Sequence, residues 1–221
     1  MNCDSQFRIS FLDTTEHIDK YFDVLPHWDQ YGKVQFITFR LFDSLPQEKL
    51  NELKENNDKF LKRYPKPWNK DVAKLYYTTI GRKVQYWLDQ NYGSCVLKYQ
   101  EVRDKIVEGW LKHHKKSYYL HEFVIMPNHV HIILSMLEEL QVCLKLIKGS
   151  ASFFVNRILD RKGKLWMQSD FDRMVRSEDS FRYYVDYIHK NPRGLPNGTF
   201  TLWSDPEKLW QKEFAKSNKK D

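Results

Sequence analysis

The feature that most constrains the fold is a pair of β-rich runs separated by a turn. The runs cover residues 118–125 and 129–136, and both are dominated by β-branched, aromatic and other apolar side chains. Between them, the adjacent Pro127 and Asn128 are typical turn residues. The sequence therefore predicts two antiparallel strands at the centre of a β-sheet.

The second run contains two histidines, His129 and His131, on either side of Val130. Side chains two residues apart on a strand point to the same face, and two strand rises of about 3.3 Å place their Cβ atoms about 6 to 7 Å apart. Both imidazoles can then converge on one divalent ion. A pair with this spacing is nevertheless more often an exposed polar face of a strand, so other residues must decide between the two interpretations.

Outside these runs, the sequence predicts one further strand and several helices. Residues 33–42 alternate side chains in the manner of a strand and are rich in β-formers, which indicates the first strand of the sheet. Helical spacing of apolar residues is found at about 47–63, 71–91, 102–112, 137–161 and 177–189. The first helix is expected to begin with a capping box at Ser44 and Gln47, and the two prolines of residues 64–69 end it.

These segments predict a single domain of mixed α and β structure, for which 221 residues are sufficient. We expect an N-terminal extension over residues 1–32, a domain over 33–203 with a helical elaboration at about 47–91, and a tail over 204–221. The tail becomes polar and lysine-rich from Gln211, so its end is expected to fray. Residues 47–91 are compatible with a partner surface, a DNA-binding addition or extra core.

Composition excludes several classes of protein and favours a polyanionic partner. Hydrophobic residues make up 41% of the chain and aromatic residues 15%, which is too much apolar surface for a disordered protein. No apolar run is long enough to span a membrane, and three widely separated cysteines favour neither a disulfide framework nor a zinc site, so a cytoplasmic location is expected. The net charge is +7, and residues 145–193 carry 11 Lys and Arg against 6 Asp and Glu.

The predicted helix at 177–189 carries tyrosines on two faces. A buried stripe follows the i, i+3, i+4, i+7 pattern at Phe181, Tyr184, Val185 and Ile188. A neighbouring face has residues spaced by four, namely Tyr183, Tyr187 and Asn191. A tyrosine on that face is available as a nucleophile, although an aromatic pair with this spacing more often packs against another element. Asn191 precedes Pro192, which biases its backbone away from helical geometry.

Three segments, in this order, resemble the HUH single-tyrosine transposases of small insertion sequences. They are VIMPNHVHIIL at 124–134, LIKGSASFFVNR at 146–157 and LWMQSDFDRMVRSEDSFRYYVDYIHKNP at 165–192. The resemblance is greatest to the REP-associated tyrosine transposase branch of that family, and it extends over residues 33–203. The sequence departs from the family pattern at Met167, which interrupts a common Trp-Gln pair, and at RGLPNGT directly after Pro192.

The resemblance implies a fold and a set of site residues. The fold is of the α+β class: a ferredoxin-like antiparallel four-stranded sheet with helices on one face and, in this chain, a helical insertion. His129, His131 and Asn191 would ligate a divalent metal, Mg²⁺ or Mn²⁺. Tyr187 would be the catalytic nucleophile. DNA phosphates would be bound at the basic positions of the motifs, which are occupied by Lys148, Arg173 and Arg176.

The implied activity is metal-dependent cleavage and rejoining of single-stranded DNA through a 5′-phosphotyrosine intermediate, at sites flanked by hairpins. The partners would be single-stranded or hairpin DNA and, as in some members of the group, a second copy of the chain in a homodimer. Two alternatives stay open. A rolling-circle replication initiator commonly has lysine four residues after the tyrosine, where this chain has Asn191. A domesticated DNA-hairpin-binding protein keeps the fold without cleaving, for instance with the residues after Trp203 folded over the cleft.

Overall fold

A five-stranded antiparallel sheet in the order β6-β3-β5-β4-β7 forms the centre of the computed structural model, which describes residues 8–13, 15–16, 19–22, 26–168 and 171–217. Its strands are β3 (Val34–Arg40), β4 (Tyr118–Ile125), β5 (His129–Met136), β6 (Phe171–Met174) and β7 (Thr201–Ser204). When the strands of this sheet are numbered in chain order, β3, β4, β5 and β6 have the 4-1-3-2 arrangement of a ferredoxin-like sheet. The fifth strand, β7, pairs with β4, so the predicted sheet of four strands was one strand short.

The three strands predicted from alternation are all present. The central hairpin has the predicted bounds, and β3 lies within the predicted 33–42 and pairs with β5 along its whole length. Alternation along β5 sends Val130 and Ile132 into one core of the protein, whereas Ile133 belongs to a second core on the opposite face. Since side chains two apart share a face, His129 and His131 lie on the Ile133 face.

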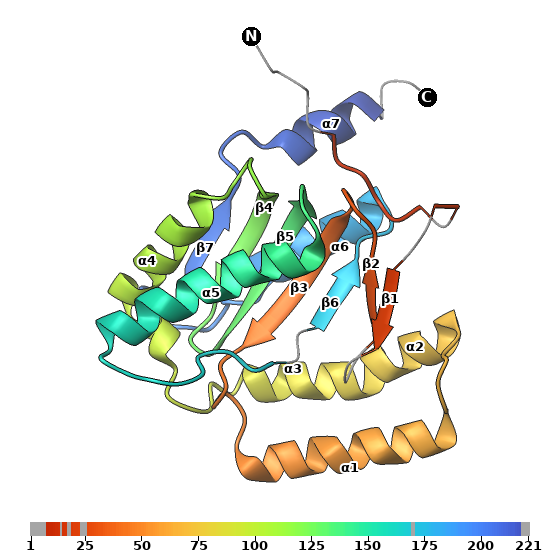
Figure 1. Ribbon diagram of the computed structural model, residues 1–221, viewed down its shortest axis with the longest axis horizontal. Helices are drawn as coiled ribbons and strands as arrows, with labels where there is room; N and C mark the ends of the chain where they lie inside the picture. Colours follow the sequence, from red (N-terminus) through yellow and green to blue (C-terminus); the bar gives the residue numbers. More distant parts are fainter. Residues whose placement is uncertain (1–7, 14, 17–18, 23–25, 169–170, 218–221) are drawn as a thin grey trace.

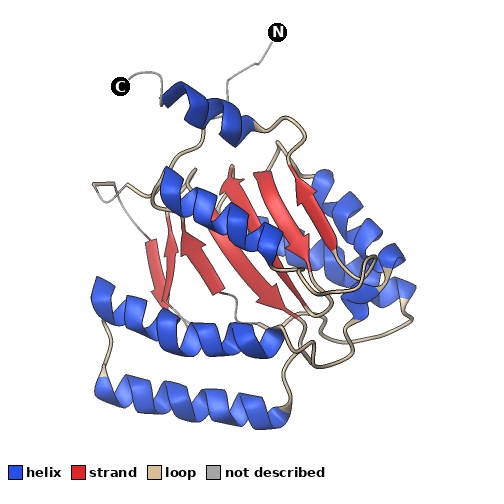
Figure 2. Ribbon diagram, turned by 180° about the vertical axis from the view of Figure 1, so that it is seen from behind, coloured by secondary structure: helices blue, strands red, loops and turns tan. Residues whose placement is uncertain are grey.

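Helices cover both faces of the sheet, so the prediction of helices on one face was wrong (Figures 1 and 2). On one face, α4 (Gln100–Leu111) and α5 (Leu140–Ile158) bury Trp110 and Ile147 against the strands. On the other, α6 (Glu178–Lys190) buries Phe181 and Ile188 against β4 and β5. The apolar stripe of α6 needs a sheet face of its own because the first face is already filled by α4 and α5.

The helical elaboration is a pair of helical segments at one edge of the molecule, below β6 and β3 in Figure 1. It consists of α1 (Gln47–Arg63), α2 (Lys70–Tyr76), the π-helical turn η1 (Tyr77–Gly81) and α3 (Arg82–Leu88). A 3₁₀ turn, η2 (Val96–Lys98), then leads into α4. The predicted capping box was wrong, because the N-cap is Pro46 and Ser44 Oγ instead donates a hydrogen bond to the Leu41 carbonyl at 2.7 Å.

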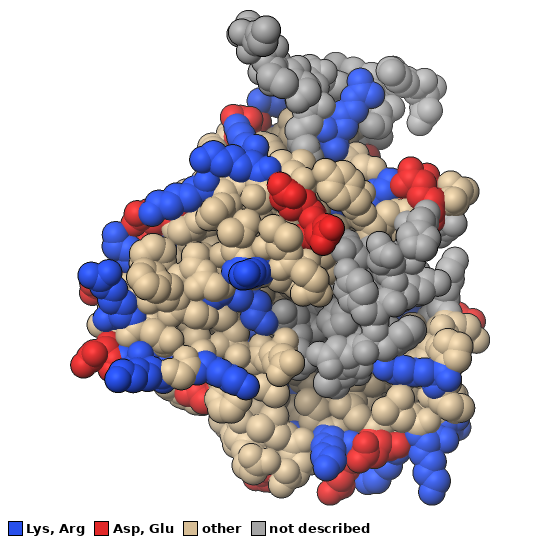
Figure 3. Space-filling view, in the orientation of Figure 1, with Lys and Arg blue, Asp and Glu red and all other residues tan. Residues whose placement is uncertain are grey.

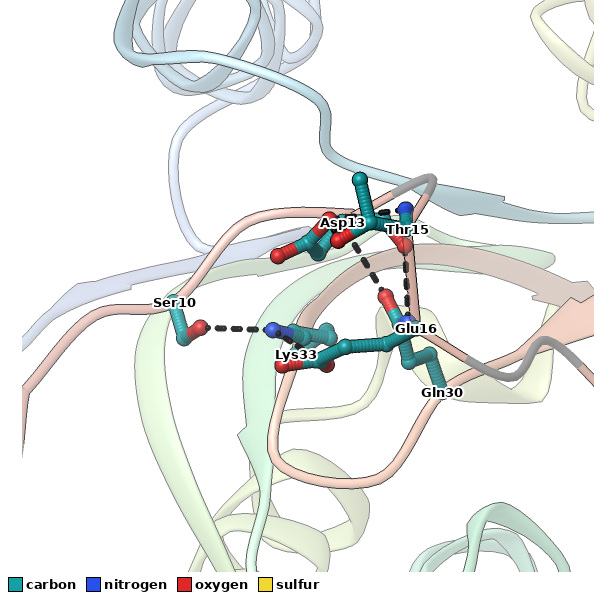
Figure 4. Close-up of polar contacts among 6 residues, drawn as sticks. All are labelled: Ser10, Asp13, Thr15, Glu16, Gln30 and Lys33. Atoms are coloured by element: carbon teal, nitrogen blue, oxygen red, sulfur yellow. Dashed lines mark hydrogen bonds and ion pairs between the residues drawn. The ribbon is translucent and has the colours of Figure 1, made fainter.

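Part of the N-terminal extension is tied to the sheet. Its described residues include a two-stranded hairpin, β1 (Asp19–Phe22) with β2 (Pro26–Asp29). The Gln30 side chain donates to the Asp13 carbonyl and accepts from the Asp13 amide, both at 2.9 Å (Figure 4). Lys33 donates to Ser10 at 3.1 Å and pairs with Glu16 at 3.0 Å. These contacts fix Ser10, Asp13 and Glu16 beside the start of β3.

The tail forms a helix where fraying was expected. In α7 (Leu209–Ser217), Trp210 and Phe214 are buried and pack against Phe181 of α6. The expectation of a frayed end was therefore wrong for residues 211–217, while residues 218–221 lie outside the described part of the chain. The lysines of this segment concealed an apolar pair spaced by four, which is the spacing of one helix face.

Two further features concern the surface. Among the described residues, none of the helices is both long enough and apolar enough to cross a membrane. On the face drawn in Figure 3, Lys and Arg lie mainly along the outer edges of the molecule, and Asp and Glu are interspersed with them. The positive net charge is therefore not gathered into one patch on this face.

Candidate active site

The helix that carries the tyrosines begins with a well-formed cap. Ser177 Oγ accepts from the Ser180 amide at 3.2 Å, and Ser180 Oγ accepts from the Ser177 amide at 2.9 Å. Glu178 and Asp179 lie in the first turn, where they interact favourably with the helix dipole. The predicted helix is thus confirmed, and its buried stripe fixes how the helix is rotated about its axis.

That rotation directs Tyr187 at the histidine pair. Its ring centroid lies 5.0 Å from that of His131, at an interplanar angle of 76°. His131 and His129 are also in edge-to-face contact, with centroids 4.8 Å apart. Phe36 of β3 packs against this group, with its ring 5.9 Å from Tyr187 and stacked on Tyr184 at 4.3 Å. One chain therefore brings the predicted nucleophile and both predicted histidine ligands together.

Hydrogen bonding around His129 selects its tautomer. Nδ1 lies 2.7 Å from Asn128 Oδ1, while the Asn128 amide nitrogen donates to the carbonyls of Leu88 and Tyr92, each at 3.2 Å. Because the Asn128 oxygen can only accept, His129 carries its proton on Nδ1. Its Nε2 atom is then the unprotonated nitrogen and carries the lone pair, which is the form of imidazole that binds metals.

His131, on the same strand as His129, has a similar arrangement with a residue of the neighbouring strand β3. Its Nδ1 atom lies 2.7 Å from the Thr38 hydroxyl, and its buried Nε2 atom has no hydrogen-bond partner. Asn191 Oδ1 is likewise buried without a partner. Asn191 has helical backbone angles (φ −58°, ψ −44°), so the expectation of a non-helical backbone at this position was wrong. It follows Tyr187 by one turn of helix, with its amide bonded to the Tyr187 carbonyl at 2.9 Å.

These atoms suit a divalent cation. An uncharged imidazole nitrogen and an amide oxygen, both buried and both lacking a donor, have the chemistry of metal ligands, and mixed nitrogen and oxygen ligands suit Mn²⁺ at least as well as Mg²⁺. Within the described ranges, no group of three or more His, Cys, Asp or Glu is arranged to hold a metal ion. A metal at this position would therefore depend on the amide of Asn191 for its third protein ligand.

Burial determines the protonation of the site. It lowers the pKa of His129 to about 3 and the pKa of His131 well below its usual value, so both rings are neutral near pH 7. Burial raises the pKa of the Tyr187 phenol above its usual 10, and the nearby Asp89 charge raises it further. A hydrogen bond from Asn191 and the charge of Arg173 act in the opposite direction.

Two residues of the helical elaboration, Gln85 and Asp89, reach the site although sequence reasoning missed them. Gln85 Nε2 lies 3.5 Å from His129 Nε2 and donates to Asp89 Oδ1 at 2.9 Å. The two are spaced by four on α3 and its C-cap, so they share a helix face. Their spacing was a usable signal for a common face, but no local pattern places that face against a histidine 44 residues later. Thr38 was missed as well, because no local pattern places it beside a histidine 93 residues later.

The three predicted DNA-binding residues lie in different places. Arg173 is on β6, close enough to Tyr187 for its charge to act on the phenol. Lys148 is on α5, on the other side of the sheet from the histidine face, and donates to the Met167 carbonyl at 3.0 Å. Arg176 precedes α6 and is therefore about three helical turns from Tyr187. Only Arg173 is brought to the candidate site.

No protein-family model matches the chain, and no curated protein matches it. Among solved structures, the chain is similar to a REP-associated tyrosine transposase bound to a REP hairpin, with 18% sequence identity and a TM-score of 0.40. The match covers 74% of this chain and 68% of the other chain. A match at this level of similarity assigns no activity to this chain.

Proposed function

We propose that this protein cleaves and rejoins single-stranded DNA through a covalent link to Tyr187, with the help of a divalent metal ion. The substrate class is single-stranded DNA flanked by a hairpin, which is what the resemblance of the sequence motifs to the single-tyrosine transposases implies. The observation that carries the proposal is the contact between Tyr187 and His131 within one chain, next to buried ligand atoms that lack donors. An aromatic cluster with a purely structural role would not require two buried acceptor atoms, His131 Nε2 and Asn191 Oδ1, that have no hydrogen-bond donor.

The chemistry assigned to Tyr187 is an in-line attack on phosphorus. Its phenolic oxygen forms a bond to the scissile phosphorus and loses its proton, while the bond to the 3′-oxygen breaks and that oxygen takes up a proton. The phosphodiester is thereby exchanged for a 5′-phosphotyrosine link. A free 3′-hydroxyl can later attack the same phosphorus and release Tyr187, so rejoining needs no nucleotide cofactor.

The residues around Tyr187 would prepare this step. His129, His131 and Asn191 would hold Mg²⁺ or Mn²⁺, which when bound polarises a phosphate oxygen and stabilises charge on the leaving group. Phe36 packs against the Tyr187 ring and holds it at the histidine face. Asp89 is the acidic group whose charge acts on the phenol, and it belongs to the same hydrogen-bonded chain as Gln85 and His129.

The test uses labelled single-stranded oligonucleotides that contain the hairpins flanking the gene. Wild type, Tyr187→Phe and Tyr183→Phe would be incubated with each oligonucleotide in Mn²⁺ or in EDTA and separated on denaturing gels. We expect a Mn²⁺-dependent protein–DNA adduct in wild type and Tyr183→Phe, and none in Tyr187→Phe. Tyr183 is a matched control because it is 63% exposed on the same helix. An adduct that persists in Tyr187→Phe would refute the proposal.

The second candidate function is binding of hairpin DNA without cleavage. One observation favours it: the Gln85 amide lies close to His129 Nε2, one of the atoms that a metal would need. Hairpin binding by wild type without any adduct in Mn²⁺ would support this candidate over the first. The tail does not supply a seal for such a protein, because α7 packs on Phe181, near the first turn of α6, whereas Tyr187 lies in its last turn.

A further inference from the structure

The position of Arg173 is set by the helical elaboration. The guanidinium carbon of Arg173 lies 4.0 Å from the ring centroid of Tyr77, in the π-helical turn η1. This is a close cation–π contact, and it joins β6 to a helix that lies about 90 residues earlier in the chain. The guanidinium is planar, so stacking on the ring fixes both its place and the direction of its donors.

Gly81 lies beside this contact. A Cβ atom at this position would be in ordinary van der Waals contact with both residues, 3.8 Å from Arg173 Nη2 and 3.7 Å from Tyr77 Cδ1. Four residues further along, Gln85 contacts His129. One face of the α2–η1–α3 segment, made by Tyr77, Gly81 and Gln85, therefore contacts both the candidate metal ligand His129 and Arg173. π-Helical turns of this kind are frequent at functional sites.

Arg173 has no acidic partner among the described residues. Its neighbours there are the ring of Tyr77 and the backbone at Gly81, whereas Arg182 on α6 is bonded to Glu178. A half-buried guanidinium held against a ring, with its charge acting on Tyr187 and no carboxylate paired with it in the described part of the chain, is suited to an anionic ligand. Arginine binds phosphate oxygens with two parallel hydrogen bonds, which also orients the phosphate.

We propose that Arg173 binds the phosphodiester group attacked by Tyr187, and that Tyr77 of the inserted helix is the positioning residue that holds the guanidinium in place. The inference rests on the proposed function, since it names the residue that orients the scissile phosphate for the tyrosine. It also assigns a role to the α2–η1–α3 segment, which forms a wall of the active site. The ligand class is a single-stranded DNA phosphodiester.

The experiment measures phosphodiester binding without requiring cleavage. The probe is the dinucleotide TpT, which contains one phosphodiester, and its control is the TpT analogue with a neutral methylphosphonate. Binding would be followed through the arginine Nε–H signals in ¹H–¹⁵N spectra of the full chain. Four proteins would be compared: wild type, Arg173→Gln, Tyr77→Leu and Tyr77→Phe. The Phe variant keeps the aromatic ring and therefore tests the ring separately from the hydroxyl.

We expect one arginine signal, absent in Arg173→Gln, to shift with TpT and not with the methylphosphonate. Tyr77→Leu should weaken TpT binding about tenfold, the loss expected for one charge-assisted interaction, and Tyr77→Phe should restore it. The inference is overturned if TpT shifts no Arg173 signal, or if Tyr77→Leu and Tyr77→Phe bind TpT equally. Adduct formation by wild type tests the proposed function separately, so failure of one is distinguishable from failure of the other.

Discussion

The carboxylate of Glu122 lies 3.0 Å from Nε2 of His189, a contact that joins β4 to the last turn of the tyrosine helix α6. A bulge between Leu120 and Glu122 turns this carboxylate to the α6 face of the sheet. There it also accepts from Trp210 Nε1 at 3.0 Å and from the Ser204 hydroxyl at 2.6 Å. One buried side chain thus holds α6, α7 and β7 together and fixes the end of α6 at which Tyr187 lies.

The first prediction concerns this network. Glu122→Ala should destabilise the protein by about 2 kcal/mol or more, because it leaves the buried Trp210 donor and the half-buried Ser204 donor without an acceptor, and a buried donor left in this way costs about 1–3 kcal/mol. His189→Ala should cost less than about 1 kcal/mol, since the imidazole is half exposed. Urea unfolding of both variants measures the two free energies. Equal losses of unfolding free energy in the two variants would show that the contact with His189 accounts for the whole contribution of Glu122 to stability.

The second prediction concerns the tail. Phe214 is buried among Phe11, Phe181 and Trp210, so Phe214→Ala should lower the free energy of unfolding by about 3–5 kcal/mol. Removing residues 207–221 should likewise destabilise the protein and should not raise its activity, whereas removing residues 218–221 leaves α7 intact and serves as the control. Thermal unfolding and adduct formation would be measured together. A stable, more active protein lacking 207–221 would show that α7 is an inhibitory cover.

The third prediction concerns the loss of stability at low pH. Burial lowers the pKa of both His121 and His129 to about 3. Below pH 6.5 the unfolded chain therefore binds protons that the folded chain does not, so stability is full above pH 6.5 and falls as the pH falls towards 3. The slope is about 1.4 kcal/mol per pH unit for each such histidine. Urea unfolding at pH 7.0, 6.0 and 5.0 measures it. A free energy that stays constant over this range would contradict the burial of neutral histidines.

The fourth prediction concerns the proposed metal site, and the chain offers a matched pair of hydroxyls for testing it. The Thr38 hydroxyl lies 2.7 Å from His131, and the Ser135 hydroxyl lies 2.8 Å from His121 on the same sheet face. Thr38→Val should weaken Mn²⁺ binding by about 10- to 100-fold, because it removes the group that orients a ligand. Ser135→Ala should leave it unchanged, and His131→Ala should abolish it. Calorimetric titration with Mn²⁺ measures these affinities. Equal Mn²⁺ affinities in Thr38→Val and Ser135→Ala would show that the metal binds elsewhere.

Local pattern was sufficient for the elements that carry the proposed nucleophile and the proposed histidine ligands. The alternation of residues 129–136 places His129 and His131 on one face of β5, and the apolar stripe of α6 sets the rotation of that helix about its axis. Packing of α6 on the same face then brings Tyr187 to His131. β6 and β7 were not predicted because four residues are too few to show a period. Their positions depend on pairing with β3 and β4, which is a property of the assembled sheet.

The contacts that the helical elaboration makes with the candidate site could not be predicted from local pattern either. Gln85 and Tyr77 look like ordinary surface residues of an amphipathic helix. Their roles arise because α3 lies below the start of β5 and beside β6, an arrangement that no spacing within residues 70–88 specifies. Long-range packing, and not the motif, gives the histidine pair and Arg173 their neighbours.

The most direct measurement is the site of the covalent DNA link. After reaction with a hairpin-flanked oligonucleotide in Mn²⁺, the protein would be digested with nuclease and protease, and the peptide carrying the residual nucleotide would be identified by mass spectrometry. The peptide spanning α6 contains Tyr183 and Tyr184 as internal alternatives. We predict that the nucleotide is attached to Tyr187 and that His131→Ala yields no modified peptide. Attachment to Tyr183 or Tyr184, or the absence of any modified peptide from wild type, would contradict the assignment of Tyr187 as the nucleophile.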